Sequence, residues 1–318
     1  MTSFFITTTA RDTPWNPYSH ANYLRVIKSA EVGNGTKYEI ADDPKYADIV
    51  IFVEPQRRYQ SDIRCEPMYR DYKEKAMVLD FFDNPKPLIP GLYVGLSAKD
   101  AGYDAYQAGF YIRVADNRML EPVDARLVNR DLLFSFVGKV SNSPAVRGRI
   151  VNLKHPGGLV MDQSSNQSDN DASYVRTIFR SKFVLAPRGI GPASWRLFET
   201  MKAGRVPVII SDEWVPPQGI RWDDMSIRVA ESDVNLIPEI LESFESQSLE
   251  MGRTAREEWV RFFSKEGSFG WISERLSEIR SKYLTGAALE KKMIHYLNRS
   301  SIGEKREIAK EMISVRLR

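Results

Sequence analysis

Arginine and glycine residues gather in one short stretch of the chain, between residues 187 and 199. Gly189 and Gly191 can adopt backbone angles that other residues avoid, and Arg188 and Arg196 stand on either side of them. The first N–H groups of a helix are free and the helix dipole is positive there, so a glycine turn that leads into a helix attracts anions. The stretch therefore predicts a site for a ligand that carries phosphate.

The elements that must hold this stretch are a strand before it and a helix and a strand after it. The apolar run FVLAP at 183–187 predicts the first strand. From Ser194 to Gly204 apolar residues recur on one side, which predicts an amphipathic helix with Gly204 just beyond its end. The run VPVII at 206–210 is almost continuously apolar, as expected for a strand of a parallel sheet covered on both faces.

The same alternation of strand and helix patterns extends over most of the chain. Strands are expected at 4–8, 47–54, 76–83, 92–96, 132–139, 183–187, 206–210 and 226–233, and helices at 21–31, 64–75, 145–154, 173–181, 194–204, 234–244 and 249–264. This order predicts an α/β fold with right-handed crossovers. Two such units in tandem predict a cleft between them, with the chemistry at the carboxyl ends of the strands.

The patterns divide the chain into three parts, which are residues 1–130, residues 131–270 and C-terminal helices at 271–318. The last part is basic, with lysines and arginines at 291–292, 305–306, 316 and 318. Three interpretations stay open for it: a solvated helical face, a helix that packs across a domain boundary, or a surface that touches anionic lipid heads. The polar stretch 162–172 is expected to be an exposed loop, either a spacer or a lid over a substrate.

Composition excludes several classes of protein. A net charge of +3 over 318 residues does not suggest a nucleic-acid-binding protein. The single cysteine, Cys65, excludes an intrachain disulfide framework, fits a reducing compartment and is interpreted as a plain thiol. The N-terminus lacks the pattern of a signal peptide and no apolar run is long enough to span a membrane. We expect a cytoplasmic protein, with contact to the inner membrane surface as an open alternative.

Two blocks of sequence resemble the signature of exostosin-type glycosyltransferases (family 47). The first is F-V-L-x-P-x-G at 183–189, followed by Ser194, Arg196 and F-E-T-M-x-x-G-x-V-P-V-I-I-S-D at 198–212. The second is LLFSFVGKV at 132–140 with VRGRI after it, and the resemblance covers roughly residues 130 to 245.

The resemblance implies a GT-B fold, in which two Rossmann-like domains face each other across a cleft. It also implies inverting transfer of a sugar from a nucleotide donor to an acceptor. Unlike eukaryotic members, the sequence shows neither a secretory anchor nor several cysteines. It looks like a bacterial, cytoplasmic relative that acts on a lipid-linked or soluble glycan acceptor.

A nucleotide-sugar donor leaves as a diphosphate, so its site must stabilise growing negative charge. No Asp-x-Asp pair stands at an expected strand end, so no metal and no other cofactor is expected, and cationic side chains with backbone amides take that role. The donor-binding candidates are Gly138, Arg147, Arg188, Gly189, Gly191, Ser194, Arg196 and Glu199.

Three of these candidates carry open alternatives. Arg196 either binds phosphate or is a surface residue of its helix, and Ser194 caps the helix, faces the phosphate or does both. Similar enzymes use a glutamate at the position of Glu199 to accept hydrogen bonds from ribose hydroxyls. The alternative for Glu199 is a favourable interaction with the helix dipole.

Inverting transfer needs a base that takes the proton of the acceptor. Four residues lie in loops after the strands expected in the first domain and stay open as alternatives, namely Asp12, His20, Glu54 and Asp83. The expected function is metal-independent transfer of a sugar from a nucleotide donor in cell-surface polysaccharide synthesis. UDP is the favoured nucleotide of the donor, and GDP is the second choice. The rivals are another nucleotide-sugar enzyme on a similar scaffold and a non-catalytic module that binds nucleotide sugars.

Overall fold

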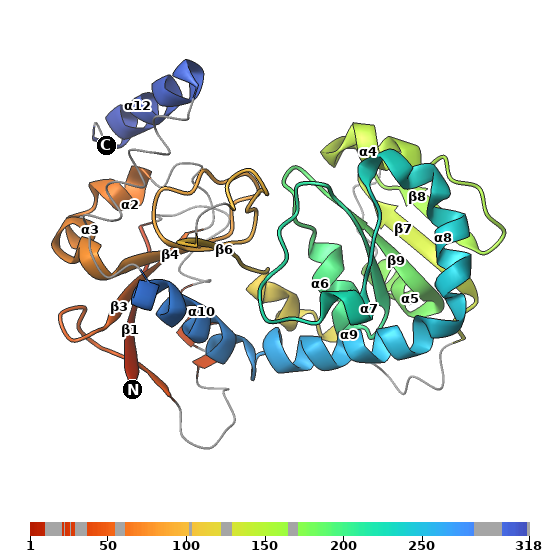
Figure 1. Cartoon of the computed structure of the whole chain (residues 1–318), viewed down its shortest axis with the longest axis horizontal. Coiled ribbons are helices and arrows are strands. Elements are labelled where there is room, and N and C mark those ends of the chain that lie inside the picture. Colours follow the sequence, from red (N-terminus) through yellow and green to blue (C-terminus); the bar gives the residue numbers. More distant parts are fainter. Residues whose placement is uncertain are drawn as a thin grey trace. The chain divides into compact units, whose positions relative to one another are not determined.

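The computed structural model describes most of the chain, namely residues 1–9, 21, 23–25, 27–28, 37–54, 61–101, 104–121, 129–164, 171–282 and 301–316. The chain forms two compact units, Met1–Phe110 with Lys265–Arg318, and Tyr111–Ser264. The boundaries expected from the sequence lie at 130 and 270 instead. Each unit has a parallel sheet of its own (Figure 1).

The first unit is built on a six-stranded parallel sheet in the order β2-β1-β3-β4-β5-β6. Its strands are β1 (Thr2–Thr7), β2 (Tyr38–Ile40), β3 (Ile49–Glu54), β4 (Ala76–Asp80), β5 (Gly91–Tyr93) and β6 (Tyr106–Ala108). Its helices are α2 (Ser61–Cys65), α3 (Pro67–Tyr72), the 3-10 helix η1 (Lys73–Lys75), α10 (Ser268–Lys282) and α12 (Ile302–Arg316). The continuous apolar runs of β3 and β4 explain their place in the middle of the sheet, because central parallel strands are buried on both faces.

Helix α10 joins the first unit although it follows the second unit in sequence. The rings of Phe4 and Phe269 meet edge to face with centroids 6.2 Å apart. Phe110 and Trp271 meet in the same way at 5.6 Å. These buried aromatic contacts give the C-terminal segment a reason to return to the first sheet.

Helix α12 begins with a reciprocal cap. The backbone N–H of Glu304 donates to Ser301 Oγ at 3.2 Å, and the backbone N–H of Ser301 donates to Glu304 Oε2 at 2.9 Å. Lysine, arginine and glutamate residues alternate along the helix. No described helix of the chain has the length and apolarity needed to cross a membrane.

The second unit has a five-stranded parallel sheet in the order β11-β10-β9-β7-β8. Its strands are β7 (Leu132–Gly138), β8 (Gly158–Asp162), β9 (Ser181–Pro187), β10 (Val206–Ile210) and β11 (Ile227–Arg228). Its α-helices are α4 (Pro144–Ile150), α5 (Asp171–Arg180), α6 (Trp195–Lys202), α7 (Trp222–Met225), α8 (Ile237–Phe244) and α9 (Ser248–Phe262). Short 3-10 helices complete it, namely η2 (Ile112–Asp116), η3 (Arg118–Leu120), η4 (Val140–Asn142), η5 (Glu231–Leu236) and η6 (Glu245–Gln247).

Strand β9 shows why this sheet needs helices on both faces. Phe183 and Leu185 are fully buried in a core that they share with side chains of α4 and α8. Val184, which points the other way, is buried with Ile178 and Phe179 of α5. The apolar run 183–187 of β9 is thus buried on both faces of the sheet, between two helical layers. The predicted α/β class with two parallel sheets is confirmed.

The helix expected at 194–204 is α6, which begins one residue later and ends two residues earlier. Ser194 occupies the N-cap position with extended backbone angles, and Gly204 follows the helix with a φ of +66°. A left-handed residue directly after a helix is most easily glycine, because it has no Cβ. Strands β2, β6 and β8 are not among the expected elements. Strands β2 and β6 have three residues each, and β8 is only partly buried.

Residues 111–121 belong to the second unit because a buried lysine holds them there. The ammonium of Lys202, at the end of α6, is fully buried and donates to the carbonyl of Ala115 at 2.8 Å. Its Nζ also lies 3.1 Å from Glu121 Oε1, while Arg256 donates to Glu121 Oε2 at 2.8 Å. Glu121 is therefore the carboxylate that neutralises a buried cation.

Replacement of Glu121 by glutamine should lower stability at neutral pH and matter less in acid. Burial alone would raise the pKa of Glu121, but hydrogen bonds from Arg256 and Lys202 outweigh it and the pKa lies below its ordinary value of 4.5. A depressed carboxyl pKa stabilises the fold above that ordinary value, and the stabilisation is lost as the pH falls through the folded pKa. Thermal unfolding midpoints of Glu121→Gln and wild type, measured from about pH 7 down to about pH 3, should therefore converge.

Glu239→Gln is the matched control, because Glu239 is an exposed glutamate of α8 in the same unit. Its unfolding midpoint should follow that of the wild type across the whole pH range. A Glu121→Gln defect of equal size at both ends of the range would contradict the charge argument.

Candidate functional site

The carboxyl ends of β7 and β9 form the centre of the candidate site. The two strands are parallel neighbours, so the loops that follow them start side by side. Gly138 is the last residue of β7, and the loop after β9 contains Arg188, Gly189, Gly191 and Ser194. The structure thus brings together the donor-binding candidates that the sequence places in two separate blocks.

Arg147 of α4 ties these two loops together. Its side chain is buried, with Nη1 donating to the carbonyl of Lys139 and Nε to that of Arg188, both at 2.9 Å. Nη2 donates to the carbonyl of Pro187 at 3.3 Å. Burial, followed by repulsion from Arg196, lowers the pKa of Arg147 to about 10, so the guanidinium stays charged at neutral pH.

Arg196 lies against the end of β7. Its side chain is 9% exposed, which excludes the interpretation as a surface residue of the helix. Nη2 donates to the carbonyl of Val137 at 2.5 Å, and the guanidinium lies over the ring of Phe136, 4.8 Å from its centroid. Its Nε is buried and has no hydrogen-bond partner among the described residues. A buried donor without a partner is costly and calls for an explanation, whether local strain, an ordered water or a bound ligand.

Two serine hydroxyls near the same strand ends share this condition. Ser143 Oγ, before α4, and Ser211 Oγ, after β10, are buried without a partner in the described part of the chain. Ser194 caps α6 by position, but its side chain makes no hydrogen bond to the helix end. Ser194 therefore has the backbone conformation of a helix cap, but its hydroxyl does not act as one.

Gly138 makes room for Arg196. A Cβ at Gly138 would lie 2.5 Å from Arg196 Nη2 and 3.3 Å from the ring of Phe136. Gly189 is less crowded, since a Cβ there would lie 3.4 Å from Arg147 Nη2.

The expectation that Gly189 and Gly191 use backbone angles reserved for glycine is wrong. Positive φ angles among the described glycines occur at Gly91, Gly204 and Gly219. The backbone N–H of Gly189 instead donates to the carbonyl of Gly191 at 3.1 Å, which closes a turn without that conformation.

Glu199 is held by a residue that the sequence analysis did not identify as part of the site. The hydroxyl of Tyr174, on α5, donates to Glu199 Oε2 at 2.5 Å. Burial and the negative charge of Glu199 raise the pKa of Tyr174 well above 10, so the phenol keeps its proton. The guanidinium of Arg196 lies 5.8 Å from the centroid of the Tyr174 ring.

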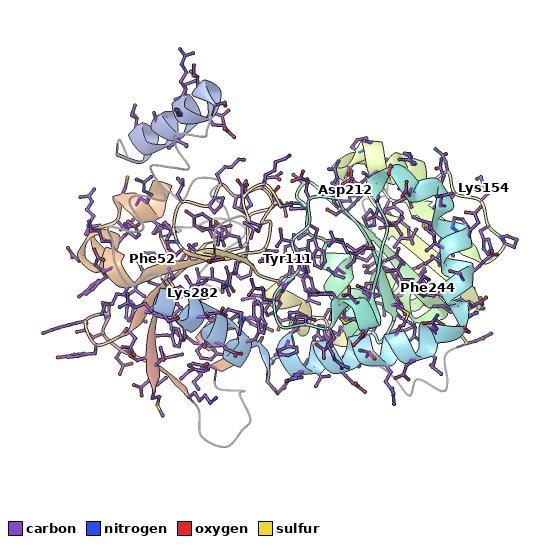
Figure 2. The ribbon with its side chains drawn as sticks, in the orientation of Figure 1. Phe52, Tyr111, Lys154, Asp212, Phe244 and Lys282 are labelled. Atoms are coloured by element: carbon purple, nitrogen blue, oxygen red, sulfur yellow. The ribbon has the colours of Figure 1, made fainter. Side chains whose placement is uncertain are left out.

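Arg188 belongs to a second contact between loops. Its Nε donates to Glu231 Oε1 at 2.8 Å, and the backbone N–H of Asp212 points to the same oxygen at 3.3 Å. The backbone N–H of Glu231 donates to Asp212 Oδ1 at 3.0 Å. Asp212, labelled in Figure 2, follows β10, so the loops after β9, β10 and β11 are joined here. Polar residues directly after apolar strands were the signal that could have revealed Asp212 and Glu231.

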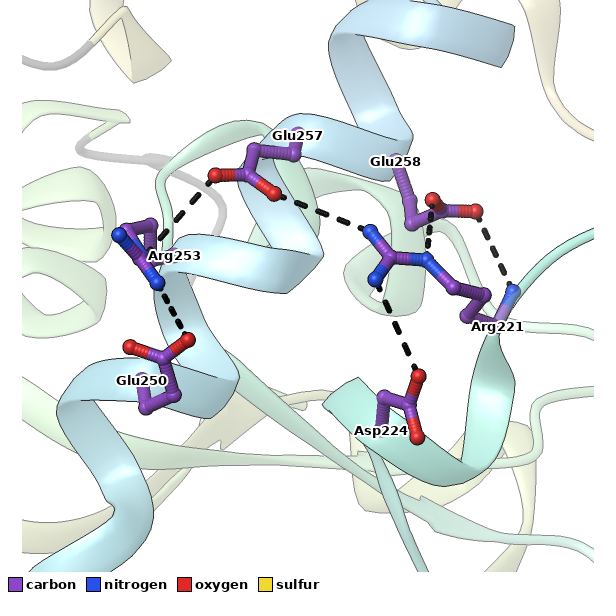
Figure 3. Close-up of polar contacts among 6 residues, drawn as sticks. All are labelled: Arg221, Asp224, Glu250, Arg253, Glu257 and Glu258. Carbon is purple, nitrogen blue, oxygen red and sulfur yellow. Dashed lines mark hydrogen bonds and ion pairs between the residues drawn. The ribbon is translucent and has the colours of Figure 1, made fainter.

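The loop after β10 is anchored at its far end by Arg221. Its Nε donates to Glu258 Oε1 at 2.9 Å, and its backbone N–H donates to Glu258 Oε2 at 3.2 Å (Figure 3). The carboxylate of Glu258 is almost fully buried. Asp224 and Glu257 lie on the other side of the same guanidinium. This cluster holds the far end of the loop on α9.

The acceptor-base candidates lie in the first unit. Asp12 and His20 fall outside the described residues, and Glu54 is described only as the last backbone position of β3. Asp83 follows β4 and is half-buried. Its loop packs closely on the chain after β5, because a Cβ at Gly95 would lie 2.2 Å from the carbonyl oxygen of Asp83. The described residues contain no group of three or more His, Cys, Asp or Glu side chains arranged to hold a metal ion.

The residues around this site match a known family. Residues 111–244 match the family model of the exostosin GT47 domain. This segment is exostosin-like. It contains Arg147, Arg188, Arg196, Glu199 and Glu231, so the contacts of these five residues fall within the matched region.

Curated relatives support the similarity. The exostosin-1 homolog of Caenorhabditis elegans is 40% identical over 101 residues, which are 30% of this chain and 26% of that protein. The probable glucuronoxylan glucuronosyltransferase IRX7 of Arabidopsis thaliana is 33% identical over 165 residues, or 47% of this chain and 37% of that protein. The chain thus spans about a quarter of the length of the first relative and just over a third of the second.

Solved structures are similar at a lower level. The glycosyltransferase WaaG, involved in lipopolysaccharide biosynthesis, is 10% identical, with a TM-score of 0.39 over 90% of this chain and 100% of that one. Anabaena Alr3699/HepE, in complex with UDP and glucose, is 10% identical, with a TM-score of 0.40 over 88% and 99%. At this level no residue of the exostosin-like segment takes a role from them.

Gly138→Ala should destabilise the protein by about 1–3 kcal/mol, the range typical of overpacking, because the new methyl group must displace the Arg196 guanidinium. The matched control is Gly148→Ala in α4, where a Cβ would meet nothing within 4 Å. Alanine is the better helix former, so this variant should be unchanged or more stable by about 0.5–1 kcal/mol. Equal stability of the two variants in thermal unfolding would show that the Arg196 guanidinium is not confined by Gly138.

Proposed function

We propose that the protein is a glycosyltransferase that moves a sugar from a nucleotide donor to a glycan or glycolipid acceptor. The exostosin GT47 match over residues 111–244 and the curated relatives named as glucuronosyltransferases support this activity. The observation that carries the proposal is the buried guanidinium of Arg196, whose Nε lacks a partner among the described residues. It lies at the first turn of α6, where a phosphate is favoured.

Two arginines supply the charge that a departing diphosphate needs. Arg147 and Arg196 are both buried and both hydrogen-bonded to neutral carbonyl oxygens, so their positive charges are not cancelled by a carboxylate in those bonds. Fixed donors of this kind stabilise charge that develops during a reaction without having to rearrange. Their planar forks suit phosphate better than an ammonium group does. We propose that this arrangement serves the donor without a metal ion.

Glu199 and Ser194 complete the proposed donor site. The carboxylate of Glu199 accepts hydrogen bonds from the ribose hydroxyls, and the uncommitted hydroxyl of Ser194 faces the phosphates. The proposed nucleotide is UDP, with GDP as the second choice. Because several relatives are named as probable glucuronosyltransferases, a negatively charged sugar belongs among the donors to be tested.

The proposed reaction is a single inverting displacement. A base of the first unit takes the proton of an acceptor hydroxyl, and that oxygen attacks the anomeric carbon of the donor. The bond from this carbon to the diphosphate oxygen breaks, and the nucleoside diphosphate leaves with the electron pair.

The biological setting is also a proposal. We infer a bacterial, cytoplasmic enzyme of cell-surface polysaccharide synthesis, with its basic C-terminal segment at the membrane surface. One cysteine in the whole sequence supports a reducing compartment. In the described part of that segment, Lys305, Arg306 and Lys310 alternate with Glu304 and Glu307, so α12 alone is a weak lipid-binding surface.

Arg196→Ala should weaken nucleotide binding by about 10- to 100-fold, because a hydrogen bond to a charged group is lost at the phosphates. Isothermal titration with UDP, GDP, UDP-glucose and UDP-glucuronic acid measures this directly. Arg176→Ala is the matched control, since Arg176 is an exposed arginine of α5. Failure of every nucleotide to bind the wild type would overturn the proposed function, whereas binding without transfer would favour a binding module.

Measuring the rate of sugar transfer in variants should identify which of the four candidates is the base. Asp12→Asn, His20→Gln, Glu54→Gln and Asp83→Asn should all keep wild-type affinity for UDP, because the proposed donor site lies in the other unit. One of them should lower the rate of sugar transfer by about 100- to 10,000-fold, the usual effect of losing a general base. Full transfer activity in all four variants would contradict a base from this set.

A further inference from the structure

We propose that Tyr174 is a positioning residue that orients Glu199 toward the ribose of the nucleotide donor. The inference rests on the proposed function, and it adds a residue and a selectivity that follow from the contacts of the site. It predicts that the hydroxyl of Tyr174 controls how strongly the protein prefers ribose to deoxyribose.

The contact that carries the inference joins two helices. Tyr174 lies on α5 and Glu199 on α6, 25 positions apart, and the phenol donates to Oε2 at 2.5 Å. A hydrogen bond to an ionised acceptor is short and about twice as strong as one between neutral groups. The bond uses one carboxylate oxygen and thereby sets the direction of the other, Oε1.

Tyr174 is itself held in place. Its ring packs on the buried cluster formed by Val175, Ile178 and Phe179 of the same helix together with Val184 of β9. A ring with few rotatable bonds in a packed setting gives its hydroxyl a defined position. The donor of the hydrogen bond is therefore more rigid than the glutamate that accepts it.

A cation also lies near Glu199 on the same helix. Arg196 precedes Glu199 by three positions, and side chains at this spacing are neighbours on a helix surface. A carboxylate that turned toward Arg196 would cancel the charge proposed to bind phosphate. The bond from Tyr174 instead gives Glu199 Oε2 a neutral donor as its partner.

The protonation state of the phenol fits this role. Burial comes first and the charge of Glu199 second among the causes that raise the pKa of Tyr174 well above 10. The hydroxyl is thus a hydrogen-bond donor throughout the neutral range. Arg196 acts in the opposite direction and does not reverse the shift.

The experiment compares nucleotides with and without a ribose hydroxyl. The dissociation constants of UDP, 2′-deoxy-UDP and 3′-deoxy-UDP are measured by isothermal titration, or those of the guanosine series if GDP is the nucleotide bound by the wild type. In the wild type, loss of a hydroxyl that binds an ionised carboxylate should weaken binding by about tenfold or more. The quantity compared is the ratio of the dissociation constant of the deoxy form to that of UDP. In Tyr174→Phe this ratio should be smaller by at least about threefold, and in Glu199→Ala it should approach about one.

This ratio of dissociation constants distinguishes a lost orientation of Glu199 from a general loosening of the site. A loosened site weakens the ribose and deoxyribose forms by the same factor and leaves the ratio unchanged, which would overturn the inference. Tyr93→Phe is the matched control, because it removes the hydroxyl of a buried tyrosine that hydrogen-bonds Ile89 in the first unit. Its ratio should equal that of the wild type.

The outcomes distinguish this inference from the proposed function. If no nucleotide binds the wild type, the proposed function fails and the inference fails with it. If nucleotides bind with a ribose preference that depends on Glu199 but not on the Tyr174 hydroxyl, only the inference fails. Should Tyr174→Phe not fold, Tyr174→Leu removes the same hydroxyl while keeping an apolar side chain, and the ratio is measured there.

Discussion

The guanidinium of Arg147 joins the ends of two neighbouring strands, and the geometry of the site depends on this contact. It donates to the carbonyls of Lys139, Pro187 and Arg188, where the hydrogen bonds of the sheet come to an end. Buried carbonyl groups need partners, and the planar fork of an arginine can serve three of them in a fixed arrangement. One side chain thereby joins the loops after β7 and β9, whose strands already pair in the sheet.

Repulsion between like charges is the cost of this arrangement. Arg188 and Arg196 both act to lower the pKa of Arg147, in addition to its burial. Arg188 is balanced by Glu231, whereas Arg147 and Arg196 donate in this site to neutral carbonyls. An anion that bound here would meet guanidiniums already in place and would relieve their mutual repulsion. This is a stronger argument for a phosphate ligand than the N-terminus of α6 alone.

Local patterns predicted the order of β9, α6 and β10, because each element shows its own apolar period and α6 ends at a glycine. Contacts between distant positions could not be predicted in this way. Tyr174 and Glu199 are 25 positions apart, and Arg188 and Glu231 are 43 apart. Each pair meets only because the parallel sheet brings separate loops and helices together. A single sequence contains no period that links them.

Two arginines with neutral partners differ in kind from one that is paired with a carboxylate. Arg188 and Glu231 together carry no net charge, so their contact chiefly joins loops. Arg147 and Arg196 keep their positive field, since carbonyl oxygens hold a guanidinium in place without neutralising it. In the proposed reaction negative charge grows on the departing diphosphate, and donors that are already oriented stabilise it best. The carbonyl partners that fix these two side chains are therefore what would make them effective at the donor phosphates.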